Sequence, residues 1–326
     1  MNAQRSEHYS PRRGLLYAVG GTFLLATNFC TAKYAMGGFD SAEGFDPGTF
    51  ALVWTSAAAF YSLVICLATG RTRELAVPRR AAWAPALLGV CTGAGMLLAW
   101  AALDRLDPPL AAFIARFTTV MTVILGVVLL RERLRGMEVV AMAVMVTGGL
   151  ISTVGRWEIV GLGVALMFLT CAATALQNLV AKVCVRTIHP SSLVFLRLAI
   201  GAAVIAVWVL GRGAANFQVP ARYWIVALLG AFLGPCLAHH FTFRAYHCWD
   251  LSRVSIVRTA EPLFVLSLAL LVSGRLPAGR ELLGGGIILV GAFLLAWIHF
   301  GIRRGLRKPV PHDAEGEAAK AARTEE

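Results

Sequence analysis

Ionisable side chains interrupt several long apolar stretches of this sequence. They are Arg116, Arg197, His239, His240, Arg258 and Glu261. If these stretches cross a bilayer, a charge at its centre costs about 2.5 to 3.5 kcal/mol even on insertion scales, so such a residue usually faces a cavity or a partner. We therefore take these residues as the first candidates for a ligand or ion site.

Arg116 and Arg258 could together hold an anion. Arg116 lies about eight residues into its apolar stretch, roughly 12 Å of helical rise, which is too deep for its head group to reach water easily. Two buried guanidinium groups can bind a carboxylate, phosphate or sulfonate through paired hydrogen bonds. The alternative is internal neutralisation, because Glu261 follows Arg258 by three residues and would share its helical face. Arg197 would either join such a site or cap backbone carbonyl groups.

His239 and Glu261 are the candidates for carrying a coupling proton. His239 and His240 point in different directions on a helix, so at most one of them faces a central cavity, and histidine titrates near neutrality. An intramembrane histidine can equally donate a hydrogen bond between helices. Pro262 perturbs the helix beside Glu261 and frees backbone groups, which would suit a gate.

Further polar contacts to a substrate could come from Asn28, Gln177 and Asn178, which precede Lys33 and Lys182 by one to two helical turns. The alternative role for these amides is hydrogen bonding between helices. The two lysines lie toward the ends of their apolar stretches and are expected to snorkel toward water.

The composition indicates that membrane-spanning helices position these residues. Of 326 residues, 58% are hydrophobic and only 15% are charged, against roughly 25% charged in soluble proteins. No alternating strand pattern is present, and hydrocarbon permits no unpaired backbone. The predicted fold class is an all-α polytopic membrane protein with ten transmembrane helices. Their approximate ranges are 14–36, 47–70, 82–103, 108–130, 136–154, 159–185, 190–210, 222–246, 251–272 and 281–301.

The charges of the loops predict that both termini are cytoplasmic. With the N-terminus inside, the inner segments up to Lys308 hold eighteen Lys and Arg residues, whereas the outer loops hold six. The positive-inside rule favours this orientation for a multi-pass membrane protein. Residues 302–326 carry mixed charges with Pro309 and Pro311 and too little apolar surface to fold, so they are predicted to form a disordered cytoplasmic tail.

The chain contains an internal duplication, with fragments that match in order at offsets of 141 to 149 residues. Matched positions include Asn28 with Gln177, Pro47 with Pro190, Trp83 with Trp224, Arg116 with Arg258, and Glu138 with Glu281. Because five spans per copy is an odd number, the second copy must enter the membrane from the opposite side. We predict an inverted repeat of residues 14–154 and 159–301, an architecture of secondary transporters that places the substrate near the midplane.

Glycines recur at matched places in the third and eighth predicted spans, as Gly89 and Gly93 in one and Gly230 and Gly234 in the other. This spacing favours close helix packing. The alternative is a sliding or hinge surface, supported by Pro235 directly after Gly234.

The sequence shows no signature of an enzyme or of a cofactor or metal site. It lacks GxSxG, HExxH and P-loop motifs, and it has no GxGxxG between a strand and a helix, so no catalytic residue, cofactor or metal is predicted. Six of the seven cysteines fall in apolar stretches, where cysteine acts as a small hydrophobe rather than in a disulfide framework. The net charge of +12 is spread between the spans, which argues against nucleic acid. Without a nucleotide site, transport must use a gradient or exchange.

Two short motifs add a resemblance to the duplicated ten-span pattern. Ala260, Glu261 and Pro262 in the ninth span, and the LRERL run at residues 130–134, resemble EamA-type carriers of the drug/metabolite transporter superfamily over roughly residues 14–301. The resemblance implies a bacterial inner-membrane secondary carrier, often an exporter of amino acids, related metabolites or drugs. It also implies a central cavity lined partly by the third, fourth, eighth and ninth spans. The first copy departs from the second, with Thr119 in the place of Glu261, so the halves are expected to contribute unequally to coupling.

We therefore predict a secondary transporter that exports a small organic metabolite, such as an amino acid or related organic anion. The alternative is a membrane-embedded ligand-binding sensor or assembly subunit without turnover. Three deep arginines outnumber one deep glutamate, so the substrate is expected to be anionic and to contact Arg116. The expected partners are this small molecule and the lipid bilayer, without nucleic acid, and homodimer formation is left open. The predicted substrate-binding residues are Arg116, Arg258, Glu261, His239, Asn28 and Gln177.

Overall fold

A computed structural model describes residues 11–38, 43–70, 82–130, 136–153, 157–184, 190–213, 215–248, 254, 257–274 and 277–305. All regular secondary structure in these residues is helical, and they contain no strand. Helices satisfy every backbone group within one segment, which a bilayer requires. The predicted all-α membrane fold is therefore confirmed.

The first half of the chain follows the predicted spans closely. Its helices are α1 (Pro11–Ala35), α2 (Pro47–Ala68), α3 (Trp83–Arg105), α4 (Pro108–Ala115), α5 (Phe117–Leu130) and α6 (Gly136–Thr153). Proline at the first position suits a helix start, since its missing N–H would have no partner there. Asp46 caps α2 by accepting a hydrogen bond from the Thr49 backbone N–H at 2.9 Å. The fourth predicted span is divided into α4 and α5 at Arg116.

The second half shows more interruptions. Its helices are α7 (Trp157–Cys184), α8 (Pro190–Gly211), α9 (Ala221–Ala231), the π-helix η4 (Phe232–Ala238), α10 (His239–Cys248), α12 (Glu261–Ser273) and α13 (Gly279–Gly305). The eighth predicted span is thus a series of three helical pieces. The start of the ninth, residues 251–253, lies outside the described residues.

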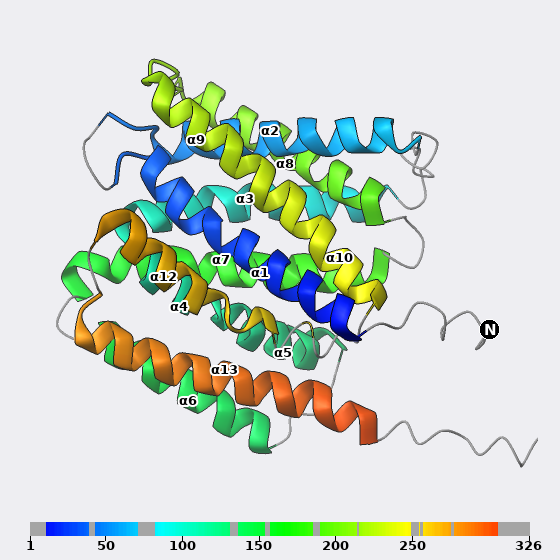
Figure 1. The fold of residues 1–326 in the computed structure, drawn as a ribbon, viewed down its shortest axis with the longest axis vertical. Coiled ribbons are helices and arrows are strands. Elements are labelled where there is room, and N and C mark those ends of the chain that lie inside the picture. Colours follow the sequence, from blue (N-terminus) through cyan, green and yellow to red (C-terminus); the bar gives the residue numbers. More distant parts are fainter. Residues whose placement is uncertain are drawn as a thin grey trace, which may run out of the picture.

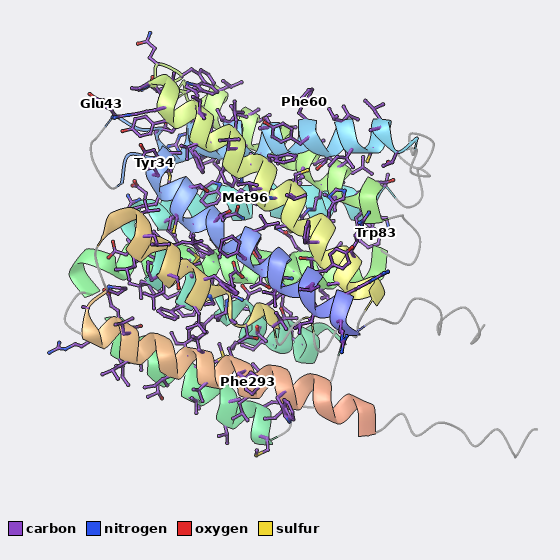
Figure 2. The ribbon with its side chains drawn as sticks, in the orientation of Figure 1. Tyr34, Glu43, Phe60, Trp83, Met96 and Phe293 are labelled. Carbon is purple, nitrogen blue, oxygen red and sulfur yellow. The ribbon has the colours of Figure 1, made fainter. Side chains whose placement is uncertain are left out.

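Length and composition support a multi-pass membrane protein. Within the described residues, five helices are long and apolar enough to cross a bilayer. They are Arg12–Ala35, Pro47–Ala68, Trp83–Arg105, Ser192–Gly211 and Ala221–Thr242. Large apolar side chains project from the periphery, among them Phe60, Trp83 and Phe293 in Figure 2, which are 62%, 61% and 47% exposed. Such a surface suits hydrocarbon rather than water.

The helices form a bundle in which the two halves interlock (Figure 1). At one end α6 packs against α13, and at the other end α2 packs against α8. Between them, α3 packs against α7, and the segment η4–α10 of the matched eighth span packs against α1. In the same way α4 and α5 of the fourth span pack against α7, and α12 of the matched ninth span packs against α1. Spans at matched positions of the two halves thus make matching contacts. The start of α1 and the end of α13 both lie on the right-hand side of the bundle in Figure 1.

Close helix contacts explain two of the matched glycines. A Cβ atom on Gly93 of α3 would lie only 2.8 Å from the backbone oxygen of Gly201 in α8, and one on Gly234 of η4 would overlap the side chain of Asn28 in α1. Both positions therefore require glycine for packing, which agrees with the close-packing interpretation.

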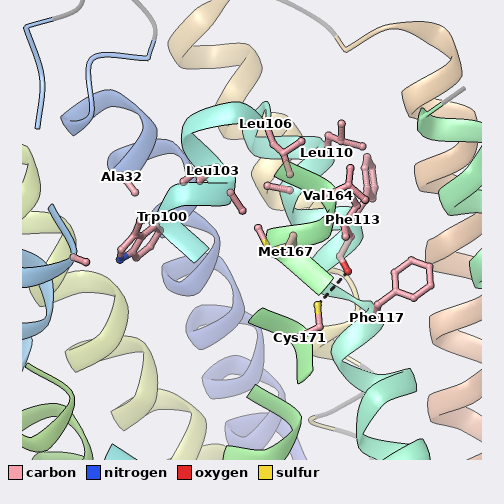
Figure 3. Close-up of a cluster of buried hydrophobic side chains, with 14 of the residues drawn as sticks. Ala32, Trp100, Leu103, Leu106, Leu110, Phe113, Phe117, Val164, Met167 and Cys171 are labelled. Carbon is pink, nitrogen blue, oxygen red and sulfur yellow. Dashed lines mark hydrogen bonds between the residues drawn. The ribbon is translucent and has the colours of Figure 1, made fainter. Parts of the chain in front are cut away.

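Buried aromatic and aliphatic side chains fill the interior beside the helix ends. Phe50, Trp54 and Trp100 lie with ring centroids 5.1 to 5.5 Å apart. A second group from α3, α4 and α7 continues this core in Figure 3, where the dashed line marks the Cys171 thiol donating to the Ile114 carbonyl at 3.6 Å. This packing holds the end of α4 in place immediately before Arg116.

The structure departs from the sequence predictions at two helix ends. Lys33 does not snorkel: its side chain is buried, and its Nζ atom donates to the carbonyl oxygens of Leu103 at 2.9 Å and Asp104 at 2.8 Å. The last carbonyl groups of α3 have no hydrogen-bond donor within the helix, so the ammonium group of Lys33 supplies one and also interacts favourably with the negative end of the helix dipole. The side chain of Lys182 lies outside the described residues. Helix α13 continues to Gly305, into the segment predicted as a disordered tail, because arginine is a good helix former even beyond the apolar run. Residues 306–326 lie outside the described residues.

Candidate functional site: helix breaks that meet at buried charges

The fourth and ninth spans both break next to the matched arginines. Helix α4 ends at Ala115, and the Arg116 N–H bonds the Phe113 carbonyl at 3.1 Å in a tight turn before α5 begins. In the second half, the Ala260 N–H bonds the Val257 carbonyl at 3.0 Å, and α12 begins at Glu261. Discontinuous helices near the midplane are the usual frame of transporter binding sites.

A third break lies in the eighth span. Helix α9 ends at Ala231, and the π-helix η4 contains Pro235, whose ring nitrogen cannot donate to the preceding turn. His239 follows at the start of α10. The matched helix α3 is continuous through Gly93 and Gly95. Single-turn π-helices often mark functional positions.

Arg116 and Glu261 form an ion pair that joins the two halves. The Arg116 Nη2 atom lies 2.7 Å from Glu261 Oε2, with side chains 16% and 2% exposed. The Arg116 Nη1 atom also donates to the Arg258 carbonyl oxygen at 3.0 Å. The cation stands at the C-terminus of α4 and the anion at the N-terminus of α12, where the helix dipoles favour each. This geometry ties α4 to α12.

The partner of Glu261 differs from the one that the sequence suggested. The alternative of neutralisation by Arg258 assumed a continuous helix, on which residues three apart share a face. The chain instead turns at Thr259 and Ala260, so Glu261 opens a new helix and takes Arg116, 145 residues away, as its ion-pair partner. Arg116 is accordingly neutralised inside the protein.

Arg197 and His239 form a second buried contact. The Arg197 Nη2 atom lies 3.1 Å from His239 Nε2. Arginine can only donate, so the imidazole Nε2 must accept, and His239 is neutral in this arrangement. Arg258 acts electrostatically on both residues. Within the described residues Arg197 bonds this histidine, and no hydrogen bond to backbone carbonyls, the alternative role given for it, is seen there.

The remaining predicted residues divide between the two sides of the bundle. The Asn28 Oδ1 atom is buried beside Gly234 and has no hydrogen-bond partner among the described residues. Gln177, its match in the second half, lies against Gly95 of α3. His240 turns away, and its Nδ1 donates to the Cys236 carbonyl at 3.0 Å. The side chain of Asn178 lies outside the described residues.

The structure thus brings Arg116, Arg258 and Glu261 together and places His239 beside them through Arg197. We name these five residues the charge cluster. Sequence reasoning undervalued Arg197, although its depth in an apolar stretch was the available signal. A separate groove of about 560 Å³ lies between α2 and α9, and apolar residues such as Phe60, Phe217 and Leu228 line most of it. No member of the charge cluster lines this groove.

Metal chemistry finds no support in the part of the chain that the structure describes. These residues contain no group of three or more His, Cys, Asp or Glu side chains that could hold a metal ion. The charge cluster offers one carboxylate and one imidazole among three guanidinium groups, and guanidinium is not a metal ligand. The arrangement is instead suited to oxyanions.

Comparison with known proteins gives a family and a fold. Residues 12–154 and 161–297 each match the model of the EamA-like transporter family. A solved crystal structure superposes with a TM-score of 0.60 at 16% sequence identity, covering 92% of this chain and 100% of that chain. At this identity the likeness concerns the fold alone. No curated protein matches the chain.

Proposed function

Because this chain belongs to the EamA-like transporter family, we propose that it is a secondary transporter that exports a small organic anion, such as an amino acid or related metabolite. The coarser assignment, a membrane transporter, follows from the family. Substrate class, direction and energy source are our proposal, as are the inner membrane and the cytoplasmic termini.

The charge cluster carries this proposal. Three arginines meet one glutamate at the point where three helices break, so the cluster has a surplus of positive charge within the described residues. Buried arginines in a membrane protein are expensive and usually serve a substrate or ion path. A surplus of cations favours an anionic substrate over a cationic one.

We further propose that residues 14–154 and 159–301 are inverted repeats that rock against each other. The pairing of α3 with α7 and of η4–α10 with α1 supports this symmetry. In such a mechanism, the Arg116–Glu261 ion pair would hold α4 and α12 together in one state. An anion bound within the charge cluster would weaken the attraction between Arg116 and Glu261, loosening this connection and freeing a carboxylate that can take up a proton.

Each predicted site residue has a place in this mechanism. Arg116 and Arg258 supply the positive potential, and Glu261 or His239 carries the coupling proton. Asn28 on α1 and Gln177 on α7 offer polar contacts. The energy would come from an ion gradient or from exchange, since the sequence has no nucleotide-binding motif.

Transport by the purified full-length protein in liposomes tests the proposal. The panel should contain glutamate, succinate and lactate as anions, alanine as a zwitterion and choline as a cation, each with and without a proton gradient. We expect at least one anion to move faster than in empty liposomes and in liposomes with Arg116→Ala. Movement of choline alone would overturn the anion assignment. Binding without movement would favour the sensor or assembly-subunit alternative.

Orientation needs its own experiment. Glu43→Cys should be labelled by an impermeant thiol reagent from outside the cell, and Arg79→Cys only after the membrane is opened. The reverse pattern would overturn the proposed topology while leaving the transport proposal intact.

A further inference from the structure

Arg197 is an arginine of the charge cluster that no described ion pair joins to an acid. Its Nη2 atom contacts His239 Nε2 at 3.1 Å, and its Nε atom is buried without a hydrogen-bond partner. Arg105, Arg116 and Arg222 each pair with an acid in the part of the chain that the structure describes, and none of these three ion pairs involves Arg197. A buried guanidinium group without a counter-charge is unfavourable. A ligand that brings an anion to Arg197 would remove this cost.

Arg116 is in the opposite situation. Its guanidinium group already bonds Glu261 Oε2 at 2.7 Å and the Arg258 carbonyl oxygen at 3.0 Å. An anion that binds Arg116 must displace the Glu261 carboxylate, and the side chain of Glu261 is only 2% exposed. An anion that binds Arg197 displaces no carboxylate of the described residues. The two arginines therefore differ in how readily they accept a ligand.

The surroundings of Arg197 favour an anion specifically. His239 accepts a hydrogen bond from Arg197 and so contributes no positive charge in this state. Arg258 lies close enough to repel Arg197. Two like charges in a region of low dielectric raise the local positive potential, and an anion between or beside them relieves it.

We propose that Arg197 binds the anionic group of the transported substrate. The proposal rests on the proposed transport of an anion and names the residue that holds it. The unpartnered Nε–H and the neighbouring Nη hydrogen atoms form a planar fork that matches two oxygens on one central atom. The ligand class is therefore a compact oxyanion: a carboxylate, a phosphate or a sulfonate. Arg197 lies seven residues after Pro190, about 10 Å into α8, which suits a site near the midplane.

Thermal unfolding of the purified full-length protein in detergent tests this assignment. The probes are sodium acetate, phosphate and methanesulfonate, each compared with sodium chloride at the same ionic strength. We expect one of the oxyanions to raise the unfolding temperature of the native protein. Arg197→Gln should lose this response, and Arg197→Lys, which keeps the charge but not the fork, should weaken binding by about tenfold or more. Arg222→Gln, at an arginine whose side chain is 54% exposed, is the matched control and should respond as the native protein does.

A transport measurement separates this inference from the proposed function. With whichever anion of the liposome panel is moved, Arg197→Lys should raise KM by about tenfold while keeping most of the maximal rate. If Arg197→Lys and Arg197→Gln bind and transport that anion normally, Arg197 is not its contact, although anion transport stands. If no oxyanion stabilises the native protein and none is transported, both proposals fail.

Discussion

The fourth and ninth spans of the bundle come from matched stretches of sequence but differ in chemistry. Each breaks beside an arginine, Arg116 in one and Arg258 in the other. Only the second carries a carboxylate at the break, because the first has Thr119 where the second has Glu261. The arginine of the first half therefore pairs with the acid of the second. Duplication repeats a backbone geometry, whereas the ion pair exists once and joins the two halves.

The third and eighth spans show the same division. Helix α3 is continuous, and its Gly93 serves close packing against α8. The matched segment contains Pro235, a π-helix and His239. The titratable groups of the charge cluster thus all belong to the second half. We infer that the first half supplies a rigid surface with one cation, while the second half supplies the groups that change protonation.

The largest expected effect comes from removing the single acid. Glu261→Gln leaves the buried Arg116 without its anion, which costs about 3 to 5 kcal/mol, so we expect a large fall in unfolding temperature and a transport rate lower by at least about a hundredfold. Thr119→Val, at the matched position of the first half, should leave the unfolding temperature nearly unchanged and should change the transport rate by less than about threefold. Equal effects at the two positions would contradict the asymmetry between the halves.

The next effect concerns the fork of Arg116. Lysine cannot reproduce its simultaneous bonds to Glu261 and to the Arg258 carbonyl, so Arg116→Lys should slow transport nearly as much as Arg116→Ala, by about ten- to a hundredfold. Arg258→Ala keeps the backbone carbonyl that Arg116 uses and should be milder. Initial rates in liposomes, normalised to folded protein, measure this. Normal rates for Arg116→Lys would show that point charge alone is sufficient.

A smaller effect should appear in the pH dependence of transport. When His239 takes up a proton it can no longer accept from Arg197, and it then faces Arg197, Arg258 and His240 as a further positive charge. Because Arg197 and Arg258 disfavour that proton, a fall in the native transport rate from this cause should appear only at pH values well below about 6.5, and His239→Gln, which offers an acceptor at every pH, should lack it. His240→Gln should keep the native profile, since His240 bonds Cys236 within its own segment. A flat profile for His240→Gln alone would reassign the titrating group.

The smallest effect is expected at the π-helix. Pro235→Ala restores a backbone donor to the eighth span and makes it more similar to α3, so the free energy of unfolding should rise by about 1 kcal/mol. If the π-helix shapes the site, transport should slow by a few-fold despite the greater stability. A stabilised variant with unchanged transport would show that this break serves packing only.

Much of the helical layout could be predicted because it depends on local composition. The apolar stretches, the prolines at helix starts and the proline in the eighth span act through nearby backbone groups, and the helices agree with them. The burial of Lys33 could not be predicted, because its acceptors lie on α3, 70 residues away. The extension of α13 to Gly305 was missed because a helix does not need an apolar face once it is propagating.

The sequence by itself determined that the chain is an all-helical membrane protein with matched arginines deep in its spans, because hydrocarbon permits few backbone structures and makes every charge conspicuous. Only the tertiary structure decided how those charges pair. Glu261 could have faced Arg258 along a continuous helix, but the turn before it and the packing of α4 against α12 bring Arg116 to it instead. Arg197, from α8, meets His239 across the bundle. Such contacts join residues far apart in the chain, so no local pattern encodes them.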